Sequence, residues 1–320
     1  MKRIGVLTSG GDSPGMNAAI RAVVRVGIYS EMEVYGIERG YEGLIAGDIK
    51  EMSISSVSDI IQRGGTTLRT ARSAYFMEED GFKRAMDMLE NFEIEGLVVI
   101  GGDGSLAGGL TISKSGVPVI GLPGTIDNDL AYTDYTIGFD TSVNTVLSAI
   151  GNIRDTSSSH ERSTVIEVMG RRCGDIALFA ALTGGAEIVL IPEEEPNINS
   201  ICRRLIQGKN RGKQHSIIMK AEGVNISSQE LADIITERTG LETKVVVLGY
   251  VQRGGTPSAR DRMLASCMGH KAAELLKNNS GSRAVGIRGT EIVHYDLEEA
   301  LNMKRSYDQS IMELADILSM

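Results

Sequence analysis

Short runs of β-branched and other apolar residues alternate with longer amphipathic stretches along most of the chain. Continuous apolar runs predict strands buried on both faces, which are typical of parallel sheets. The predicted strands are Ile4–Leu7, Val34–Ile37, Leu97–Ile100, Val117–Leu122, Thr164–Val168, Ile188–Ile191, Ser216–Lys220 and Lys244–Leu248. The predicted helices are Met16–Ile28, Thr141–Asp155, Ile198–Gly208, Gln229–Thr239 and Ser258–Leu276. This alternation predicts an α/β fold with right-handed crossovers.

The chain has 320 residues, and single hydrophobic cores usually divide at that size. We therefore expect two domains, with a change near the middle that no Pro/Ser-rich linker marks. Arg-Gly-Gly-Thr occurs at 63–66 and again at 253–256. Four residues without a fixed period do not establish a repeat.

Charge and cysteine content exclude several classes of function. The net charge is −9, so the basic footprint of a nucleic-acid or anionic-membrane protein is missing. The three cysteines form no CxxC pair, which argues against a disulfide framework or a zinc site. The N-terminus enters a strand pattern at once, and no apolar stretch approaches the ~20 residues of a membrane span. We expect a cytoplasmic protein with neither nucleic acid nor membrane as a partner.

A glycine-containing loop, Thr8–Asn17, connects the first predicted strand to the first helix. Glycines at such a junction let backbone N–H groups meet an anion at the positive end of the helix. The loop is neither a Walker A sequence nor a GxGxxG fingerprint. A tight turn without ligand is an equally good interpretation of this loop alone.

A second loop, Gly101–Ser105, directly follows a predicted strand. Asp103 between glycines suits Mg²⁺ bound to a triphosphate, since the glycines admit phosphates and the carboxylate holds the metal or its water. The alternative is that Asp103 caps the next helix.

A third loop, Pro123–Asp129, places Asp127 and Asp129 two residues apart after another apolar strand. Two carboxylates in one cleft need a cation between them, or one of them serves as a proton acceptor. Asx-turn chemistry is the alternative.

Several charged residues near loops are weak signals individually. Arg21 and Arg25 lie four apart on one predicted helix face, where like charges repel. With Arg154, Arg211 and Lys213 they could bind an anion, and solvated surface charge is the alternative.

Together these motifs identify a family. Thr8–Asn17, Gly101–Ser105, Pro123–Asp129, Met169–Arg171 and Gln252–Gly255 closely resemble the bacterial phosphofructokinases in order and spacing over essentially the whole chain. Gly-Gly-Asp-Gly also occurs in NAD kinases and diacylglycerol kinases, but its combination with Pro-Gly-Thr-Ile-Asp-Asn-Asp is highly specific.

The resemblance implies two interleaved Rossmann-like three-layer α/β/α domains. A larger ATP-binding domain would comprise 1–138 and 252–302. A smaller domain of 139–251 and 303–320 would bind fructose 6-phosphate. The resemblance also implies homotetramers with sites shared between subunits, and transfer of the γ-phosphate of MgATP to the 1-hydroxyl of fructose 6-phosphate.

The resemblance further assigns residues to ligands. ATP would contact Gly11, Tyr41, Arg72, Ser73, Gly102, Asp103, Gly104, Ser105 and Gly108, with Asp103 serving Mg²⁺. Asp127 would be the base, Thr125 and Asp129 would position the reacting groups, and Arg72 and Arg171 would stabilise transition-state charge. Fructose 6-phosphate would contact Thr125, Ile126, Asp127, Met169, Gly170, Arg171, Glu222, Lys244, Tyr250 and Arg253, with Arg162 reaching it from a neighbouring subunit.

ATP is favoured over pyrophosphate as donor, because pyrophosphate-dependent relatives carry Asp where Gly104 stands and Lys where Gly124 stands. The chain departs from the family pattern at the sugar-phosphate residues and in one loop. Lys244 replaces an Arg and Tyr250 a His, which predicts weaker binding of fructose 6-phosphate. The loop 67–76 differs at Arg69 and at Ala74-Tyr75, while Arg72 is retained.

The resemblance also implies an effector site for ADP or phosphoenolpyruvate. Its residues would be Arg21, Arg25, Asp59, Arg154, Gly185, Glu187, Arg211, Lys213, Gln214 and His215, with Gln214 in place of a Lys. Two alternatives stay open: a kinase for another sugar phosphate, such as tagatose 6-phosphate, and a catalytically weak sensor. Retention of the proposed base argues against the sensor.

Overall fold

The computed structural model describes residues 1–319, which form two compact units. The first unit contains 1–126, 130–141 and 253–305, and the second contains 127–129, 142–252 and the chain from Ser306 onward. The chain thus passes between the units several times. The short segment Asp127–Asp129 belongs to the second unit, unlike in the sequence-based division, because its side chains bond to residues of that unit.

The first unit is built on a seven-stranded sheet of order β11-β10-β5-β4-β1-β2-β3. Its strands are β1 (Arg3–Thr8), β2 (Glu33–Ile37), β3 (Ile49–Met52), β4 (Gly96–Gly101), β5 (Val119–Pro123), β10 (Arg283–Arg288) and β11 (Glu291–Asp296). The pairs β2–β3 and β10–β11 are antiparallel, and the remaining pairs are parallel. The central strands therefore follow the prediction from their apolar runs.

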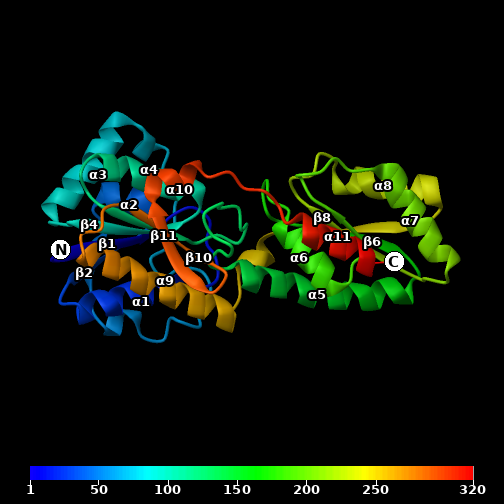
Figure 1. The fold of residues 1–320 in the computed structure, drawn as a ribbon, viewed down its shortest axis with the longest axis horizontal. Helices are drawn as coiled ribbons and strands as arrows, with labels where there is room; N and C mark the ends of the chain where they lie inside the picture. Colours follow the sequence, from blue (N-terminus) through cyan, green and yellow to red (C-terminus); the bar gives the residue numbers. More distant parts are fainter. Residues whose placement is uncertain (320) are drawn as a thin grey trace. The chain divides into compact units, whose positions relative to one another are not determined.

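Helices cover both faces of this sheet (Figure 1). The helices are α1 (Met16–Tyr29), α2 (Gly40–Ala46), α3 (Glu79–Asn91), α4 (Asp103–Lys114), α9 (Ala259–Lys277) and α10 (Leu297–Asn302), with short 3₁₀ turns at Ser55–Val57 and Tyr75–Met77. One apolar cluster joins α1 and α9 to the sheet, and a second joins α2, α3, α4 and α10 to its other face. Apolar side chains buried on both faces hold the three layers together.

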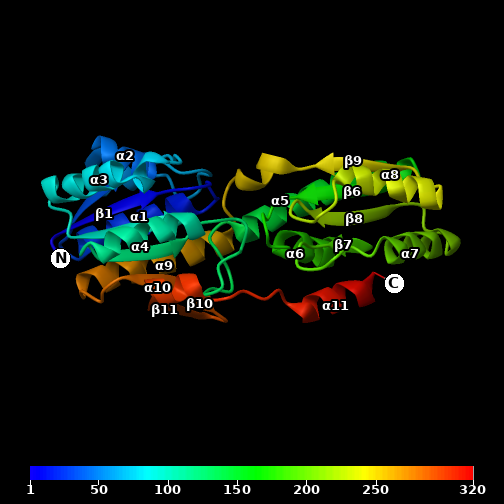
Figure 2. The same cartoon turned by 90° about the horizontal axis from the view of Figure 1, so that it is seen from above.

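The second unit is built on a parallel four-stranded sheet of order β7-β8-β6-β9. Its strands are β6 (Ser163–Val168), β7 (Ile188–Leu190), β8 (Ser216–Ala221) and β9 (Thr243–Val247). Its helices are α5 (Phe139–Ser159), α6 (Asp175–Gly184), α7 (Ile198–Asn210), α8 (Ser228–Thr239) and α11 (Gln309–Leu318), and a 3₁₀ turn spans Gly249–Arg253. Within this unit α7 and α8 lie on one face of the sheet and α5, α6 and α11 on the other (Figure 1). The view from above shows α11 running along α6 (Figure 2).

Both units are thus three-layer α/β/α arrangements, as the resemblance implied. In the described part of the chain, no helix is both long and apolar enough to cross a membrane.

Candidate active site

Three loops leave the same edge of the first unit's sheet. Strands β1, β4 and β5 are neighbours and parallel, so the segments 9–15, 101–105 and 123–126 all begin at their carboxyl ends. Ligands of open α/β sheets bind at this edge. The first two loops that the sequence indicated, together with residues 123–126 of the third, therefore share one edge of the sheet in the first unit.

Glycines bring the first two loops into contact. Gly10 has φ 83°, and a Cβ there would lie 2.9 Å from Ser105 Oγ. A Cβ on Gly101 would lie 2.6 Å from the carbonyl oxygen of Ser9. Since real Cβ atoms do not approach that closely, glycine is required at both positions for the two backbones to form one surface.

The helix α4 begins directly in this surface. Gly102 is its N-cap and Asp103 its first residue, so the interpretation of Asp103 as a capping side chain is wrong. Asp103 and Gly104 are exposed, and a Cβ on Gly104 would meet no described atom within 4 Å. The helix N-terminus thus offers backbone N–H groups, an exposed carboxylate and space at Gly104, a combination suited to Mg²⁺ and phosphate.

The side chain of Tyr41 packs against the first two turns of α4. Its ring stacks on Phe76 at 4.2 Å between centroids, and its hydroxyl donates to the carbonyl of Ser105 at 2.5 Å. A Cβ on Gly108 would lie 2.9 Å from the Tyr41 ring. Burial raises the pKa of Tyr41 above its ordinary value, so the phenol stays protonated as a donor. Direct contact of Tyr41 and Gly108 with ATP stays a prediction.

The loop that carries Arg72 is fastened to the first glycine loop. Thr70 Oγ1 donates to the carbonyl of Gly10 at 2.7 Å, and Thr8 Oγ1 donates to the carbonyl of Arg69 at 2.8 Å. Asn17 accepts from the backbone N–H of Thr67 at 2.7 Å. Arg72 itself is exposed. The sequence did not single out Thr70 or Asn17 for this role, because their partners lie about fifty residues or more away along the chain.

The two Arg-Gly-Gly-Thr segments lie against each other. A Cβ on Gly64 would lie 2.4 Å from the carbonyl oxygen of Gly255, so Gly64 allows this backbone approach. The Arg253 guanidinium lies over Gly11, 3.1 Å from where a Cβ would stand. The repeated motif therefore marks two loops in contact rather than a structural repeat.

In the second unit, the acidic turn is held by its central residue. Asn128 has φ 54°, is buried, and donates through Nδ2 to Asp175 Oδ2 at 2.8 Å. Asp175 is the first residue of α6. Asp127 is also buried, and Asp129 Oδ2 lies 3.8 Å from Nη1 of Arg171. Because Asn128 anchors the turn, the two flanking carboxylates are held in fixed positions.

The Met169–Arg171 loop follows β6 in a strained conformation. Gly170 has φ 133°, and a Cβ there would lie 2.3 Å from the carbonyl oxygen of Cys173. Arg171 has φ 54°, and its N–H donates to Glu222 Oε1 at 2.9 Å. The N–H of Met169 donates to Oε1 of the buried Gln252 at 3.2 Å. Such over-determined positive-φ backbone is found at functional sites.

Arg162 and Lys244, which were also predicted to bind the sugar phosphate, lie at the end of the second unit's sheet that is opposite to the Met169–Arg171 loop. Arg162 precedes β6 and Lys244 is at the start of β9, whereas Met169 and Glu222 follow the carboxyl ends of their strands. Six-residue β6 spans about 20 Å at the usual rise. Lys244 Nζ is paired with Glu242 Oε1 at 2.8 Å, and Lys244 lowers the pKa of Glu242. Tyr250 lies beyond β9 and is exposed.

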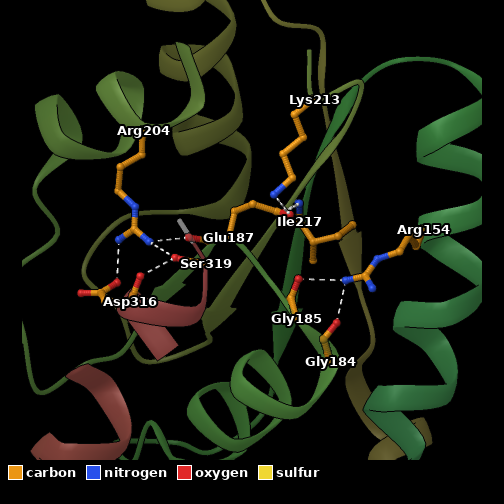
Figure 3. Close-up of polar contacts among 9 residues, drawn as sticks. All are labelled: Arg154, Gly184, Gly185, Glu187, Arg204, Lys213, Ile217, Asp316 and Ser319. Carbon is orange, nitrogen blue, oxygen red and sulfur yellow. Dashed lines mark hydrogen bonds and ion pairs between the residues drawn. The ribbon is translucent and has the colours of Figure 1, made fainter. Parts of the chain in front are cut away.

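Four of the predicted effector residues of the second unit, Arg154, Gly185, Glu187 and Lys213, lie near the starts of β7 and β8 (Figure 3). Arg154 Nη2 donates to the carbonyls of Gly184 and Gly185 at 2.6 and 3.0 Å. Glu187 pairs with Lys213 at 2.7 Å and accepts from the N–H of Ile217. These side chains are therefore already bonded within the protein.

A cavity of about 150 Å³ adjoins this cluster and is lined by Glu187, Arg204, Arg211 and Lys213 among others. Arg204 bonds to Asp316, to Ser319 and to the carbonyl of Glu187, and so ties the C-terminal helix to this cluster. The sequence did not single out Arg204, because its side-chain partners Asp316 and Ser319 come from a distant part of the chain. Gln214 and His215 lie on the loop before β8. Arg21, Arg25 and Asp59 belong to the first unit.

A glycine-bounded helix N-terminus with an exposed Asp, together with a buried carboxylate turn beside an arginine, is typical of an enzyme that transfers phosphoryl groups between small molecules. The phosphofructokinase family model matches residues 3–276, and the chain belongs to this family. The ATP-dependent 6-phosphofructokinases of Alkaliphilus metalliredigens and Clostridium botulinum are 60% and 58% identical to it, each covering all of both chains.

Among solved structures, phosphofructokinase from Saccharomyces cerevisiae matches the whole chain with a TM-score of 0.91 and 34% identity. The present chain spans 48% of the length of that yeast chain.

Proposed function

We propose that this protein transfers the γ-phosphate of MgATP to the 1-hydroxyl of fructose 6-phosphate, giving fructose 1,6-bisphosphate and ADP in glycolysis in the cytoplasm. The observation that carries the proposal is the turn Asp127–Asp129, anchored by Asn128 and facing Arg171. Full-length identity of 58–60% to ATP-dependent 6-phosphofructokinases supports the same activity.

On the donor side, the backbone at the start of α4 receives the ATP phosphates. Mg²⁺ is bound in proteins through one or two carboxylates together with substrate phosphates and water. Asp103 fits that role, since it is exposed at the helix N-terminus next to glycines. Among the described residues no cluster of three or more His, Cys, Asp or Glu could hold a metal by itself. Bound Mg²⁺ would neutralise phosphate charge, and Asp103 would orient it.

On the acceptor side, Asp127 accepts the proton of the sugar's 1-hydroxyl. Its burial keeps water away from the reacting oxygen. Thr125 and Asp129 position the reacting groups, and Arg171 and Arg72 stabilise charge that develops on the transferring phosphoryl group. Met169, Gly170, Glu222 and Arg253 hold the sugar.

The sugar-phosphate site is completed by a second copy of the chain. Arg162 and Lys244 lie at the amino end of the second sheet, and Met169 and Glu222 at its carboxyl end. Because one hexose phosphate is too short to reach both ends, the cations of one subunit serve the sugar bound to another. This supports the homotetramer that the family resemblance implies.

Regulation by ADP or phosphoenolpyruvate is proposed on the cluster around Glu187. Arg211 and Lys213 line a cavity next to that carboxylate, a setting suited to a phosphate with or without a divalent cation. If neither compound shifts the fructose 6-phosphate saturation curve, the effector role is wrong.

A coupled assay tests the reaction and its base. Wild type should turn over fructose 6-phosphate with MgATP and not with pyrophosphate, and Asp127→Asn should lose at least about 10³-fold in kcat with little change in KM for ATP. Tagatose 6-phosphate serves as the competing acceptor. Preference for it, or activity that survives in Asp127→Asn, would contradict the proposal.

Mixing two inactive variants tests the shared site. Arg162→Ala and Asp127→Asn chains, denatured and refolded together, should regain activity because one active site then contains both native residues. Refolding of each variant alone is the control. Absence of recovery in mixed oligomers would contradict a site shared between copies.

A further inference from the structure

Lys220 is a charged side chain inside the second unit that the proposed chemistry does not use. It lies on β8 with its side chain only 2% exposed. Its Nζ donates to Glu167 Oε2 at 3.2 Å and to the carbonyl oxygen of Ala221 at 3.4 Å. A lysine is almost never fully buried without such partners, and burying it is costly. No pattern in the sequence indicated this burial, since Lys220 is a charged residue near the end of a largely apolar strand.

Its partner, Glu167, connects three neighbouring elements. Glu167 stands opposite Lys220 in the β6–β8 register, and its carboxylate also accepts from the hydroxyl of Ser228 in the first turn of α8. The positive end of a helix favours a carboxylate there. The backbone carbonyl of Glu167 accepts from the N–H of Leu248 at 3.1 Å, just beyond β9. One ion pair thus joins β6, β8 and α8 and adjoins the end of β9.

The pair lies directly before the residues assigned to the sugar. Glu167 is two residues before Met169, and Lys220 is two residues before Glu222. The Ala221 carbonyl that Lys220 contacts also accepts from the N–H of Val224 at 3.2 Å, which closes the turn carrying Glu222. Glu222 in turn accepts from the N–H of Arg171.

We infer that Lys220, through its contacts with Glu167 and Ala221, is a positioning residue that sets the Glu222 turn and the Met169–Arg171 loop for the sugar phosphate. The inference rests on the proposed sugar site. Lys220 reaches the substrate only through these two loops, so it affects sugar binding and leaves the ATP site of the other unit unchanged.

The test compares four variants with wild type under conditions where each is folded and oligomeric. Lys220→Met keeps the length of the side chain but removes its cation. We expect KM for fructose 6-phosphate to rise about tenfold, the effect of one lost hydrogen bond of ordinary strength, with KM for ATP within about twofold of wild type.

Lys220→Met leaves a partly buried carboxylate without its cation, so it could fold poorly. The double variant Lys220→Met/Glu167→Gln removes both charges while the glutamine oxygen still accepts from Ser228. Its raised KM for the sugar should persist although its thermal stability recovers. A normal KM in the folded double variant would overturn the inference and make the pair purely structural.

Two further variants distinguish a general loss of stability and a wrong sugar-site assignment from a wrong role for Lys220. Met219→Ala, at the adjacent and fully buried position of β8, lowers stability without touching the pair and should keep the wild-type KM. A raised KM in Met219→Ala equal to that of Lys220→Met would also overturn the inference. Glu222→Gln tests the assignment of the sugar site. If its KM for fructose 6-phosphate is unchanged, that assignment fails. If the KM rises in Glu222→Gln but not in the Lys220 variants, only the role of Lys220 is contradicted.

Discussion

The backbone N–H of Arg171 donates a hydrogen bond of 2.9 Å to Oε1 of Glu222. This bond joins the loops that follow β6 and β8, and it holds Arg171 at a positive φ that a residue with a side chain seldom adopts. A Cβ on Gly223 would lie 2.0 Å from the carbonyl oxygen of Arg171, so the two loops touch along their backbones as well. The Arg171 guanidinium therefore lies next to the carboxylate of Asp129.

Removing the Glu222 carboxylate should release this loop. In Glu222→Ala the KM for fructose 6-phosphate should rise about 10- to 100-fold, because hydrogen bonds to a charged acceptor contribute about 1.5–3 kcal/mol. Glu222→Gln keeps an oxygen that can accept from the Arg171 N–H, so its KM for fructose 6-phosphate should rise less. Steady-state kinetics with each substrate varied measures both, and equal effects of the two variants would show that the hydrogen bond to Arg171 is unimportant.

The two glycines linked to donor choice should respond differently to substitution. The space around Gly104 is open where a side chain would begin, so Gly104→Asp should fold normally while its activity with ATP falls by at least about 100-fold through repulsion of the phosphates. Gly104→Ala is the matched control and should stay active. Normal ATP kinetics in Gly104→Asp would remove this residue from donor selection.

Gly124 has a packing role as well. A Cβ there would lie 2.9 Å from Ile100 Cγ2 and 3.0 Å from Met16 Cε. Gly124→Ala should therefore destabilise the protein by about 1–3 kcal/mol, the usual cost of overpacking. Thermal unfolding measures the loss. Unchanged stability would mean that glycine at this position serves only the ligand.

Asp261 should make stability depend on pH. It accepts from the N–H of Gly138 at 3.0 Å and from the N–H of Thr141 at 2.8 Å near the start of α5, and burial raises its pKa to about 6. The folded protein then binds this proton more tightly than the unfolded chain, whose carboxyl has a pKa of about 3.9. Its favourable contribution is full below pH ~4 and is lost as the pH rises through about 6.

The loss should amount to about 2 kcal/mol between pH 4 and pH 7, and it should be missing in Asp261→Asn, which cannot titrate. Unfolding of both proteins across this pH range measures the difference in slope. The variant is expected to be less stable throughout, since its amide N–H groups would face donors. Parallel pH profiles for the two proteins would show that Asp261 titrates normally.

Restoring the family's cations should tighten sugar binding. Lys244 is a point charge already paired with Glu242, and Tyr250 is neutral, so Lys244→Arg/Tyr250→His should lower KM for fructose 6-phosphate by about threefold to tenfold. Glu242→Gln frees Lys244 of its competing carboxylate and should act in the same direction. An unchanged KM for fructose 6-phosphate in the double variant would show that Lys244 and Tyr250 do not weaken sugar binding.

The sequence by itself determined eight of the eleven strands of the described residues, the helices α1, α5, α7, α8 and α9, and the chemistry-bearing loops. Apolar runs such as Leu97–Ile100 have few stable solutions other than a buried strand, and glycine with aspartate at a strand end has a local chemical meaning. Two missed helices lack a clear amphipathic stripe: α6 is buried almost all round, and α4 contains three glycines after Asp103. The helices α3 and α11 were missed although each is amphipathic. The edge strands β3 and β11 were missed because they are only partly buried, and β10 was missed although its centre is buried.

Only the tertiary structure decided which residues meet. The anchoring of Asn128 by Asp175, the contact of Gly64 with Gly255 and the burial of Lys220 beside Glu167 all join segments far apart in the chain. Their partners follow from strand order and register, which are set by packing of the whole sheet rather than by any local pattern. The positive φ of Arg171 has the same origin, because its cost is met by contacts with Glu222 and Gly223 that no single stretch of sequence contains.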